Sequence, residues 1–103
     1  ALGGSVIISA VLQTILNIVD FGMSPMEAVS VPRIHSEGDL VHLEARVESS
    51  QITVLESFGH KIKKSPYSFD PMMARCHVIL KDKKSWKAGA DPRSGGGVAF
   101  ARV

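Results

Sequence analysis

The chain has 103 residues, of which 45% are hydrophobic and 21% are charged, and its formal net charge is +2. This length predicts one domain or part of one, and the hydrophobic content excludes a disordered tail. The charge is too small to indicate binding to nucleic acid or to an anionic membrane. A single cysteine, Cys76, excludes an internal disulfide and leaves the compartment open.

The first segment is apolar and has helical periodicity. It predicts a helix over residues 5–21, which Gly22 ends. The helix is too short to span a bilayer, which takes roughly 20 apolar residues, and it lacks the charged start of a signal peptide. Its wide apolar stripe predicts contacts on two sides. Since the chain has no starting Met and begins inside this pattern, we expect a cut piece or a processed product.

A short second helix follows. Ser24 can cap it, Pro25 suits its first turn and Glu27 completes a capping box. Pro32 ends it near residue 31, because a residue before proline is pushed towards an extended conformation.

Residues 40–47 alternate between apolar and polar side chains, which predicts a strand with one buried face. On this pattern His42, Glu44 and Arg46 lie on the other face. A third helix is expected over residues 51–58, with Ile52, Leu55 and Phe58 inward, and Gly59 ends it.

The remaining residues predict mainly strands and turns. We expect a short strand or connection at 60–64, a loop at 65–71, and strands at 74–81, 86–90 and 97–103. The short turns between the last strands favour antiparallel pairing. Helices layered on a mainly antiparallel sheet give an α+β fold. Because only one face of this sheet is covered, we expect the other face to need a partner layer.

The spacing of the residues does not support a metal site, a Cys–His catalytic pair or a phosphate-binding loop. The four histidines show no metal-ligand spacing: His35, His42, His60 and His77. Neighbours on a strand point to opposite faces, so Cys76 beside His77 indicates a small buried side chain rather than a catalytic pair. The glycines at 95–97 indicate a hairpin turn.

Gly3 and Gly4, directly before the first helix, allow two interpretations. The first N–H groups of a helix have no internal partner and carry partial positive charge. Without a Cβ, a ligand can approach that backbone closely, which suits an anion or a developing oxyanion. Two glycines in this position can equally form a plain bend in a loop.

Several segments together resemble the γ-glutamyltranspeptidase family. The resemblance is carried by GGSVIISAVLQTILNIVDFGMSPMEAVSVPRIH, and continues through Leu55-Glu56, Gly59-His60, the strand around Val78 and Gly89-Ala90-Asp91-Pro92-Arg93. It covers essentially the whole chain. It implies part of an N-terminal-nucleophile hydrolase, a four-layer αββα sandwich whose precursor cuts itself into a large and a small subunit. No metal or organic cofactor takes part in the chemistry that the resemblance implies.

The resemblance also implies a division of the active site. Gly3 and Gly4 match the paired glycines whose N–H groups bind the tetrahedral intermediate. The catalytic N-terminal threonine and the residues that grip the substrate lie upstream in the family, while Thr14 and Thr53 fall inside predicted helices here. We therefore expect residues 1–103 to be a single partial domain, the C-terminal half of a small subunit, and to be inactive alone.

The expected partners are the rest of the small subunit and the large subunit of the same precursor, or a homo-oligomer. The expected substrate is a γ-glutamyl peptide such as glutathione, whose acyl group passes to water or to an amine. Two alternatives stay open: a related acylase or poly-γ-glutamate-cleaving enzyme, and a non-catalytic relic or structural module. Family members are often periplasmic, secreted or at the cell surface, and this chain carries no signal that chooses among these.

The Pro-Arg-x-His and Asp-Pro-Arg motifs are interpreted as structural. Arg33 is expected in an ion pair, and His35 in the extended segment that follows the second helix. Asp91 is expected to accept backbone hydrogen bonds within its own turn.

Overall fold

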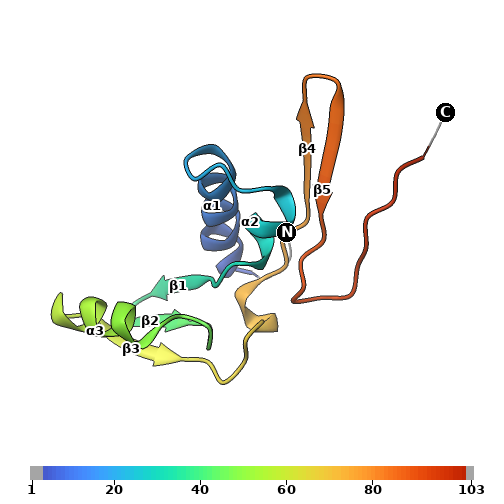
Figure 1. The fold of residues 1–103 in the computed structure, drawn as a ribbon. Coiled ribbons are helices and arrows are strands. Elements are labelled where there is room, and N and C mark those ends of the chain that lie inside the picture. Colours follow the sequence, from blue (N-terminus) through green and yellow to red (C-terminus); the bar gives the residue numbers. More distant parts are fainter. Residues whose placement is uncertain (1–3, 102–103) are drawn as a thin grey trace.

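The structure is a computed structural model that describes residues 4–101 (Figure 1). The elements in chain order are α1 (Val6–Val19), α2 (Pro25–Ser30), β1 (Ile34–Glu37), β2 (Leu40–Leu43), α3 (Ser49–Ser57), β3 (Lys61–Lys64), the 3-10 helix η1 (Pro71–Met73), β4 (Val78–Asp82) and β5 (Ser85–Gly89).

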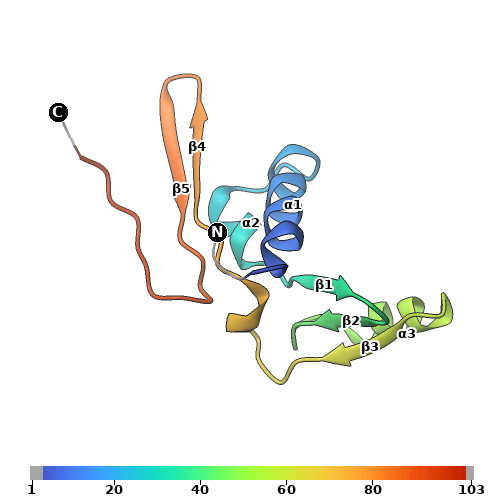
Figure 2. The ribbon, with the colours of Figure 1, turned by 180° about the vertical axis from the view of Figure 1, so that it is seen from behind.

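Residues 4–101 form two sheets that lie on opposite sides of α1 and α2. The first has the order β1-β2-β3, and the second is the hairpin β4-β5. Figure 2 shows α3 against the first sheet and the hairpin projecting from the other end of the molecule. β1/β2 and β4/β5 pair antiparallel, whereas β2/β3 pair parallel because α3 forms the crossover between them. The predicted α+β fold is confirmed.

The predicted boundary of α2 is confirmed in its atomic detail. The Ser24 hydroxyl accepts the Glu27 N–H at 3.2 Å, and the Glu27 carboxylate accepts the Ser24 N–H at 3.2 Å. These hydrogen bonds lower the pKa of Glu27. The helix passes into extended backbone at Val31, directly before Pro32.

Three strand predictions are wrong in part. The strand expected over residues 40–47 ends at Leu43, and the one expected over 74–81 starts only at Val78. Residues 97–101, the described part of the last predicted strand, contain no strand. The segment after Pro32 was expected to be extended but not to pair with another strand. In the structure it forms β1, which pairs with β2.

The apolar core lies between α3 and the first sheet. Val41 and Leu43 point to this side together with Val47, and half-buried Ile52, Leu55 and Ile62 pack against them. Ile52 and Leu55 point inward as predicted, whereas the prediction for Phe58 is wrong, because it is 75% exposed. This cluster is small, so it cannot by itself fix the helices against both sheets.

A second buried centre is made of charges and holds the remaining elements together. Glu44, Asp91, Arg33 and Arg93 are all at most 5% exposed. Arg33 Nη1 lies 2.7 Å from Asp91 Oδ2, and Arg93 Nη1 lies 3.1 Å from Asp91 Oδ1. Arg93 also donates from Nε to Glu44 Oε2 at 2.7 Å and from Nη2 to Glu44 Oε1. The prediction that Glu44 faces outward is wrong, because its carboxylate is the acceptor of this guanidinium.

The charge network also binds backbone from several segments. Arg93 donates to the carbonyls of Val29 and Val31, where α2 ends, at 2.6 and 3.0 Å. The Glu44 carboxylate accepts the N–H groups of Arg33 at 2.8 Å and Asp70 at 2.7 Å. The network therefore fixes the end of α2, the start of β1 and the loop before η1 relative to one another.

Asp91 extends the network to the chain that leads into β4. Its carboxylate accepts N–H groups from Arg93 at 2.9 Å and from Cys76 at 2.7 Å. Burial raises the pKa of Asp91, but these two N–H groups and the Arg33 guanidinium outweigh it, so the pKa is lowered. The expected ion pair of Arg33 is confirmed, and the role of Asp91 reaches well beyond its own turn.

The first prediction concerns the close approach of β5 to α2. A Cβ on Gly89 would lie 2.6 Å from the carbonyl carbon of Pro25. Gly89→Ala therefore forces backbone apart and should lower the free energy of unfolding by about 1–3 kcal/mol in urea titrations. Gly95→Ala is the control, because no described atom lies within 4 Å of its Cβ position. Equal stability of the two variants would contradict the assigned packing.

The second prediction concerns the charge network. Arg93→Met removes the guanidinium and leaves the buried Glu44 carboxylate without its partner, which should cost about 3–5 kcal/mol in the free energy of unfolding. Arg75 is exposed, so Arg75→Met should change stability by less than about 0.5 kcal/mol. Urea or thermal unfolding of both variants measures the difference, and a small loss for Arg93→Met would rule out the network as the main constraint.

The third prediction concerns pH. The pKa of Asp91 is lower in the folded protein than its ordinary value of 3.8, so its ionisation stabilises the fold above that pH. This stabilisation is lost as the pH falls through the lowered pKa. Asp91→Asn should be destabilised at pH 7, and its deficit relative to the unchanged protein should shrink below pH 3.8. Unfolding titrations from pH 7 downward measure this, and a deficit that stays constant with pH would count against it.

Candidate functional site

The start of α1 is the first part of the candidate site. Gly4 has φ +60°, a left-handed conformation that favours glycine, and no described atom lies within 4 Å of the position a Cβ would take. The Gly4 carbonyl accepts the N–H of Ile7 at 3.2 Å, which begins the helix. Gly3, the other predicted site residue, lies outside the described residues. Gly4 is therefore placed where a ligand could approach the backbone.

Ser5 occupies the N-cap position of α1 without acting as a cap. Its hydroxyl makes no capping hydrogen bond within the described chain and instead donates to Glu37 Oε2 at 2.9 Å. The first turn of α1 also carries no acidic residue within the described chain. The first turn of α1 therefore has no side-chain acceptor from Ser5 for its N–H groups, which carry the partial positive charge of a helix start.

A polar stripe on α1 seats the helix against β1. Ser5, Ser9 and Gln13 follow one another at one-turn intervals on one face of the helix. Ser9 Oγ lies 2.8 Å from His35 Nδ1. The Gln13 side chain accepts the Ile34 N–H at 3.0 Å and donates to the Ile34 carbonyl at 2.6 Å. Residues that interrupt the apolar pattern of α1 therefore determine which side of the helix meets the sheet.

His35 and Glu37 form the β1 side of this contact. His35 is 8% exposed, and its Nε2 lies 3.1 Å from Glu37 Oε2. The hydrogen bond from His35 is the largest cause that lowers the pKa of Glu37, and the one from Ser5 is next. His35 lies in extended backbone after α2, as expected.

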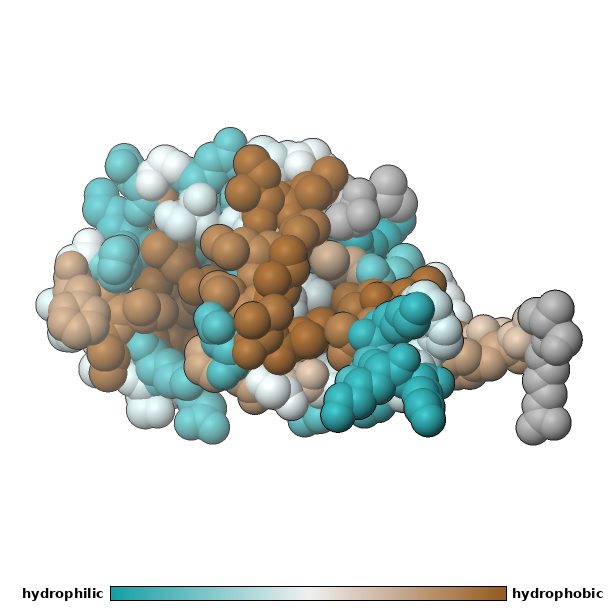
Figure 3. All heavy atoms as spheres, turned by 90° about the horizontal axis from the view of Figure 1, so that it is seen from above, coloured by the Kyte–Doolittle hydropathy of each residue, from teal (hydrophilic) through white to brown (hydrophobic). Residues whose placement is uncertain are grey.

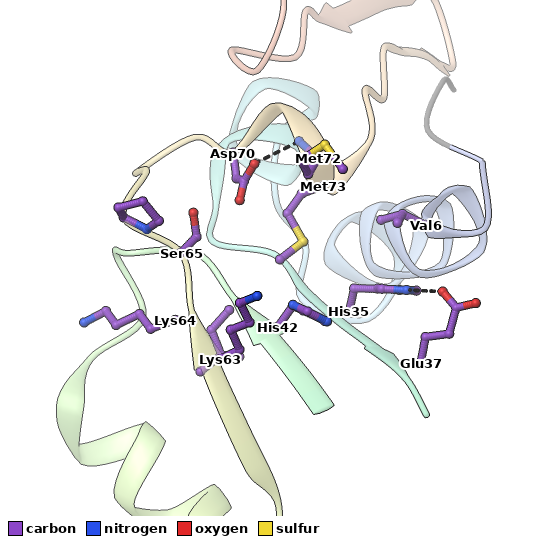
Figure 4. Close-up of a pocket in the computed structure, with 12 residues that line it drawn as sticks. Val6, His35, Glu37, His42, Lys63, Lys64, Ser65, Asp70, Met72 and Met73 are labelled. Atoms are coloured by element: carbon purple, nitrogen blue, oxygen red, sulfur yellow. Dashed lines mark hydrogen bonds and ion pairs between the residues drawn. The ribbon is translucent and has the colours of Figure 1, made fainter. Parts of the chain in front are cut away.

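A cavity of about 500 Å³ opens beside this contact, between the first sheet, η1 and the first turn of α1. Figure 4 shows His35, His42 and Lys63 on the sheet side of it, with Met73 opposite. The rings of His35 and His42 are stacked, with centroids 6.4 Å apart. In sequence order the lining is Val6, His35, Glu37, His42, Leu43, Lys63, Lys64, Ser65, Pro66, Asp70, Met72 and Met73.

The hydroxyls that could be considered as nucleophiles are engaged inside helices. Thr14 Oγ1 donates to the Ala10 carbonyl at 2.8 Å, and Thr53 Oγ1 donates to the Ser49 carbonyl at 3.0 Å. Cys76 is buried, as predicted, and His77 Nδ1 accepts the Asp91 N–H at 3.1 Å. The described residues contain no group of three or more side chains able to hold a metal ion.

Large apolar side chains remain exposed on α1 and on the hairpin. Ile8 and Val19 are 77% and 73% exposed on α1, and Ile79 and Trp86 are 74% and 56% exposed on β4 and β5. Figure 3 shows apolar side chains gathered across the face seen from above. Exposed apolar side chains that gather on one face often mark a site of protein–protein contact. None of the helices in residues 4–101 has the length and hydropathy needed to cross a membrane.

Comparison with known proteins agrees with this arrangement. The family model described as Gamma-glutamyltranspeptidase matches residues 1–101. The Acylase ACY 1 proenzyme of Pseudomonas sp. (strain V22) is 34% identical over 99 residues, which cover 92% of this chain and 18% of that protein. The Glutathione hydrolase proenzyme of Escherichia coli (strain K12) is 36% identical over 94 residues, covering 89% of this chain and 16% of that one.

The backbone of this chain also resembles that of a solved γ-glutamyltranspeptidase. The Helicobacter pylori γ-glutamyltranspeptidase T380A mutant superposes with a TM-score of 0.74 at 32% identity, covering 90% of this chain and 51% of that chain. Of the acylase and glutathione hydrolase proenzymes named above, the chain spans less than a fifth of the length. The fold is the α+β fold of part of an N-terminal-nucleophile hydrolase. Because the family model covers nearly every residue, the chain belongs to the γ-glutamyltranspeptidase family.

Proposed function

We propose that this chain is part of an enzyme that hydrolyses or transfers γ-glutamyl groups through an acyl-enzyme on an N-terminal threonine. Residues 1–103 are a single partial domain of that enzyme, equivalent to the C-terminal half of a small subunit. The observation that carries the proposal is the match of the family model to residues 1–101. The small share of each relative that the chain spans supports its being one part of a larger assembly.

In this proposal the paired glycines Gly3 and Gly4 donate their N–H groups to the oxyanion of the tetrahedral intermediate. Support comes from the left-handed φ of Gly4, the open space above it and the uncapped first turn of α1. Donors fixed in advance stabilise the negative charge that develops in the transition state, and one of them can contribute 10²–10³ in kcat. The threonine itself belongs to another part of the enzyme, since the hydroxyls of Thr14 and Thr53 are tied to their own helices. The chain alone is inactive.

The remaining parts of the same precursor are the proposed partners. They supply the nucleophile and cover the exposed apolar side chains of α1 and of the β4-β5 hairpin. Burying this surface stabilises the assembly by about 25 cal/mol for each Å² of apolar area removed from water. A second candidate function is that of an acylase, which would cleave acyl groups other than γ-glutamyl. The 34% identity with the Acylase ACY 1 proenzyme, over 92% of this chain, favours it.

The fourth prediction tests Gly4 in the assembled enzyme. Gly4→Ala strains a left-handed backbone position by about 1–2 kcal/mol, so the loop shifts and the N–H leaves its place. We expect kcat for a γ-glutamyl anilide to fall about 100-fold. Gly22→Ala is the matched control, because Gly22 has φ +64° and equally open space at the other end of α1. It should change kcat less than twofold.

Assays of the same enzymes on a glutaryl anilide distinguish the two candidate functions. Faster turnover of the γ-glutamyl substrate supports a γ-glutamyltransferase or hydrolase, and faster turnover of the glutaryl substrate supports an acylase. Equal kcat for Gly4→Ala and Gly22→Ala would remove the oxyanion role.

A further inference from the structure

We propose that Glu37 and His35 are positioning residues that hold the start of α1, and with it the Gly4 N–H, in the orientation the reaction needs. This inference rests on the proposed function of Gly4. It concerns two residues of β1 that make no hydrogen bond to Gly4 within residues 4–101 and act through Ser5.

The contact is a closed pattern of four side chains from two elements. Ser5 and Ser9 are four residues apart on one face of α1, and His35 and Glu37 are two residues apart on one face of β1. Each helix residue meets one strand residue: Ser5 donates to Glu37 at 2.9 Å, and Ser9 lies 2.8 Å from His35. The hydrogen bond of 3.1 Å between His35 and Glu37 completes the pattern.

Ser5 hydrogen-bonds to Glu37 instead of capping α1. A serine at the N-cap normally accepts a hydrogen bond from the first turn, which stabilises a helix by about 1 kcal/mol. Here the hydroxyl turns away from the helix and donates to Glu37 instead. The result is a helix start with no side-chain cap from Ser5 within residues 4–101, while the residue next to Gly4 is fixed to the sheet.

The exposure of the four groups fits a mechanical role. Glu37 is 64% exposed at its side chain, so alone it would not hold one rotamer, whereas His35 is 10% exposed at its side chain and anchored by Ser9. His35 therefore restricts Glu37, and Glu37 restricts Ser5. The carboxylate also lies near the positive end of α1, where a negative charge is favoured.

The order Ser9, His35, Glu37 resembles a nucleophile, base and acid, but its surroundings favour positioning. Among the described residues, the wall of the neighbouring cavity includes His35 and Glu37 but not Ser9. Ser9 lies within α1, and the Glu37 carboxylate is shared with Ser5. A substrate in the cavity would therefore meet the strand residues and not the Ser9 hydroxyl.

The test uses kcat and KM of the assembled enzyme for γ-glutamyl anilide. Glu37→Ala and Ser5→Ala should each lower kcat about tenfold and leave KM within twofold, because the ground-state complex does not need the aligned oxyanion donor. The double variant should lose no more than either single variant, since both remove the same link. Ser5→Thr keeps the hydroxyl and should restore kcat to within threefold of the unchanged enzyme.

Glu56→Ala is the matched control, because Glu56 is an exposed glutamate on α3, and its kcat and KM should stay within twofold. Unchanged kcat in Glu37→Ala and Ser5→Ala, or losses that multiply in the double variant, would overturn the inference while the enzyme remains active. Absence of turnover by the unchanged enzyme on either anilide would instead overturn the proposed function on which the inference rests. Since Glu37 is largely exposed, its substitution tests the link without disturbing the core.

Discussion

Two buried carboxylates and two buried guanidinium groups set the geometry on which the other elements depend. These groups pair with one another, Glu44 with Arg93 and Asp91 with both arginines. They also hydrogen-bond to backbone of α2, of the start of β1 and of the segments before η1 and β4. Charges taken out of water are costly unless every one is paired, so arrangements of these segments that separate the pairs are disfavoured. An apolar core of the same size would tolerate sliding, whereas hydrogen-bonded charges fix positions and directions.

The second constraint acts on α1, which has two different sides. Its stripe of Ser5, Ser9 and Gln13 is hydrogen-bonded to β1, whereas apolar side chains such as Ile8 and Val19 stay exposed. A purely apolar helix could rotate about its axis at little cost, but here rotation would break specific hydrogen bonds. The orientation of α1 therefore leaves its apolar side free for another layer, and it sets the direction in which the helix start faces.

Local features were predictable from the sequence, and distant pairs were not. The capping box of Ser24 and Glu27 is confirmed because both partners lie within one turn. Glu44 was misplaced because its alternation with apolar neighbours indicated an outward side chain, while its partner Arg93 lies 49 residues away. Ser5 and Glu37 are 32 residues apart, so the sequence offered no sign of their contact. The motif order indicated the family correctly, and Gly4 lies at a helix start as expected.

The late position of Arg93 in the chain has a consequence for how the protein is made. During synthesis from the N-terminus, Arg33 and Glu44 emerge before Asp91 and Arg93, so their charges stay hydrated until these two partners have left the ribosome. The helices and the first sheet can then form only loosely, and the interior closes in one step when the final charges arrive. Closure of this interior therefore waits for Asp91 and Arg93 to be synthesised rather than advancing strand by strand.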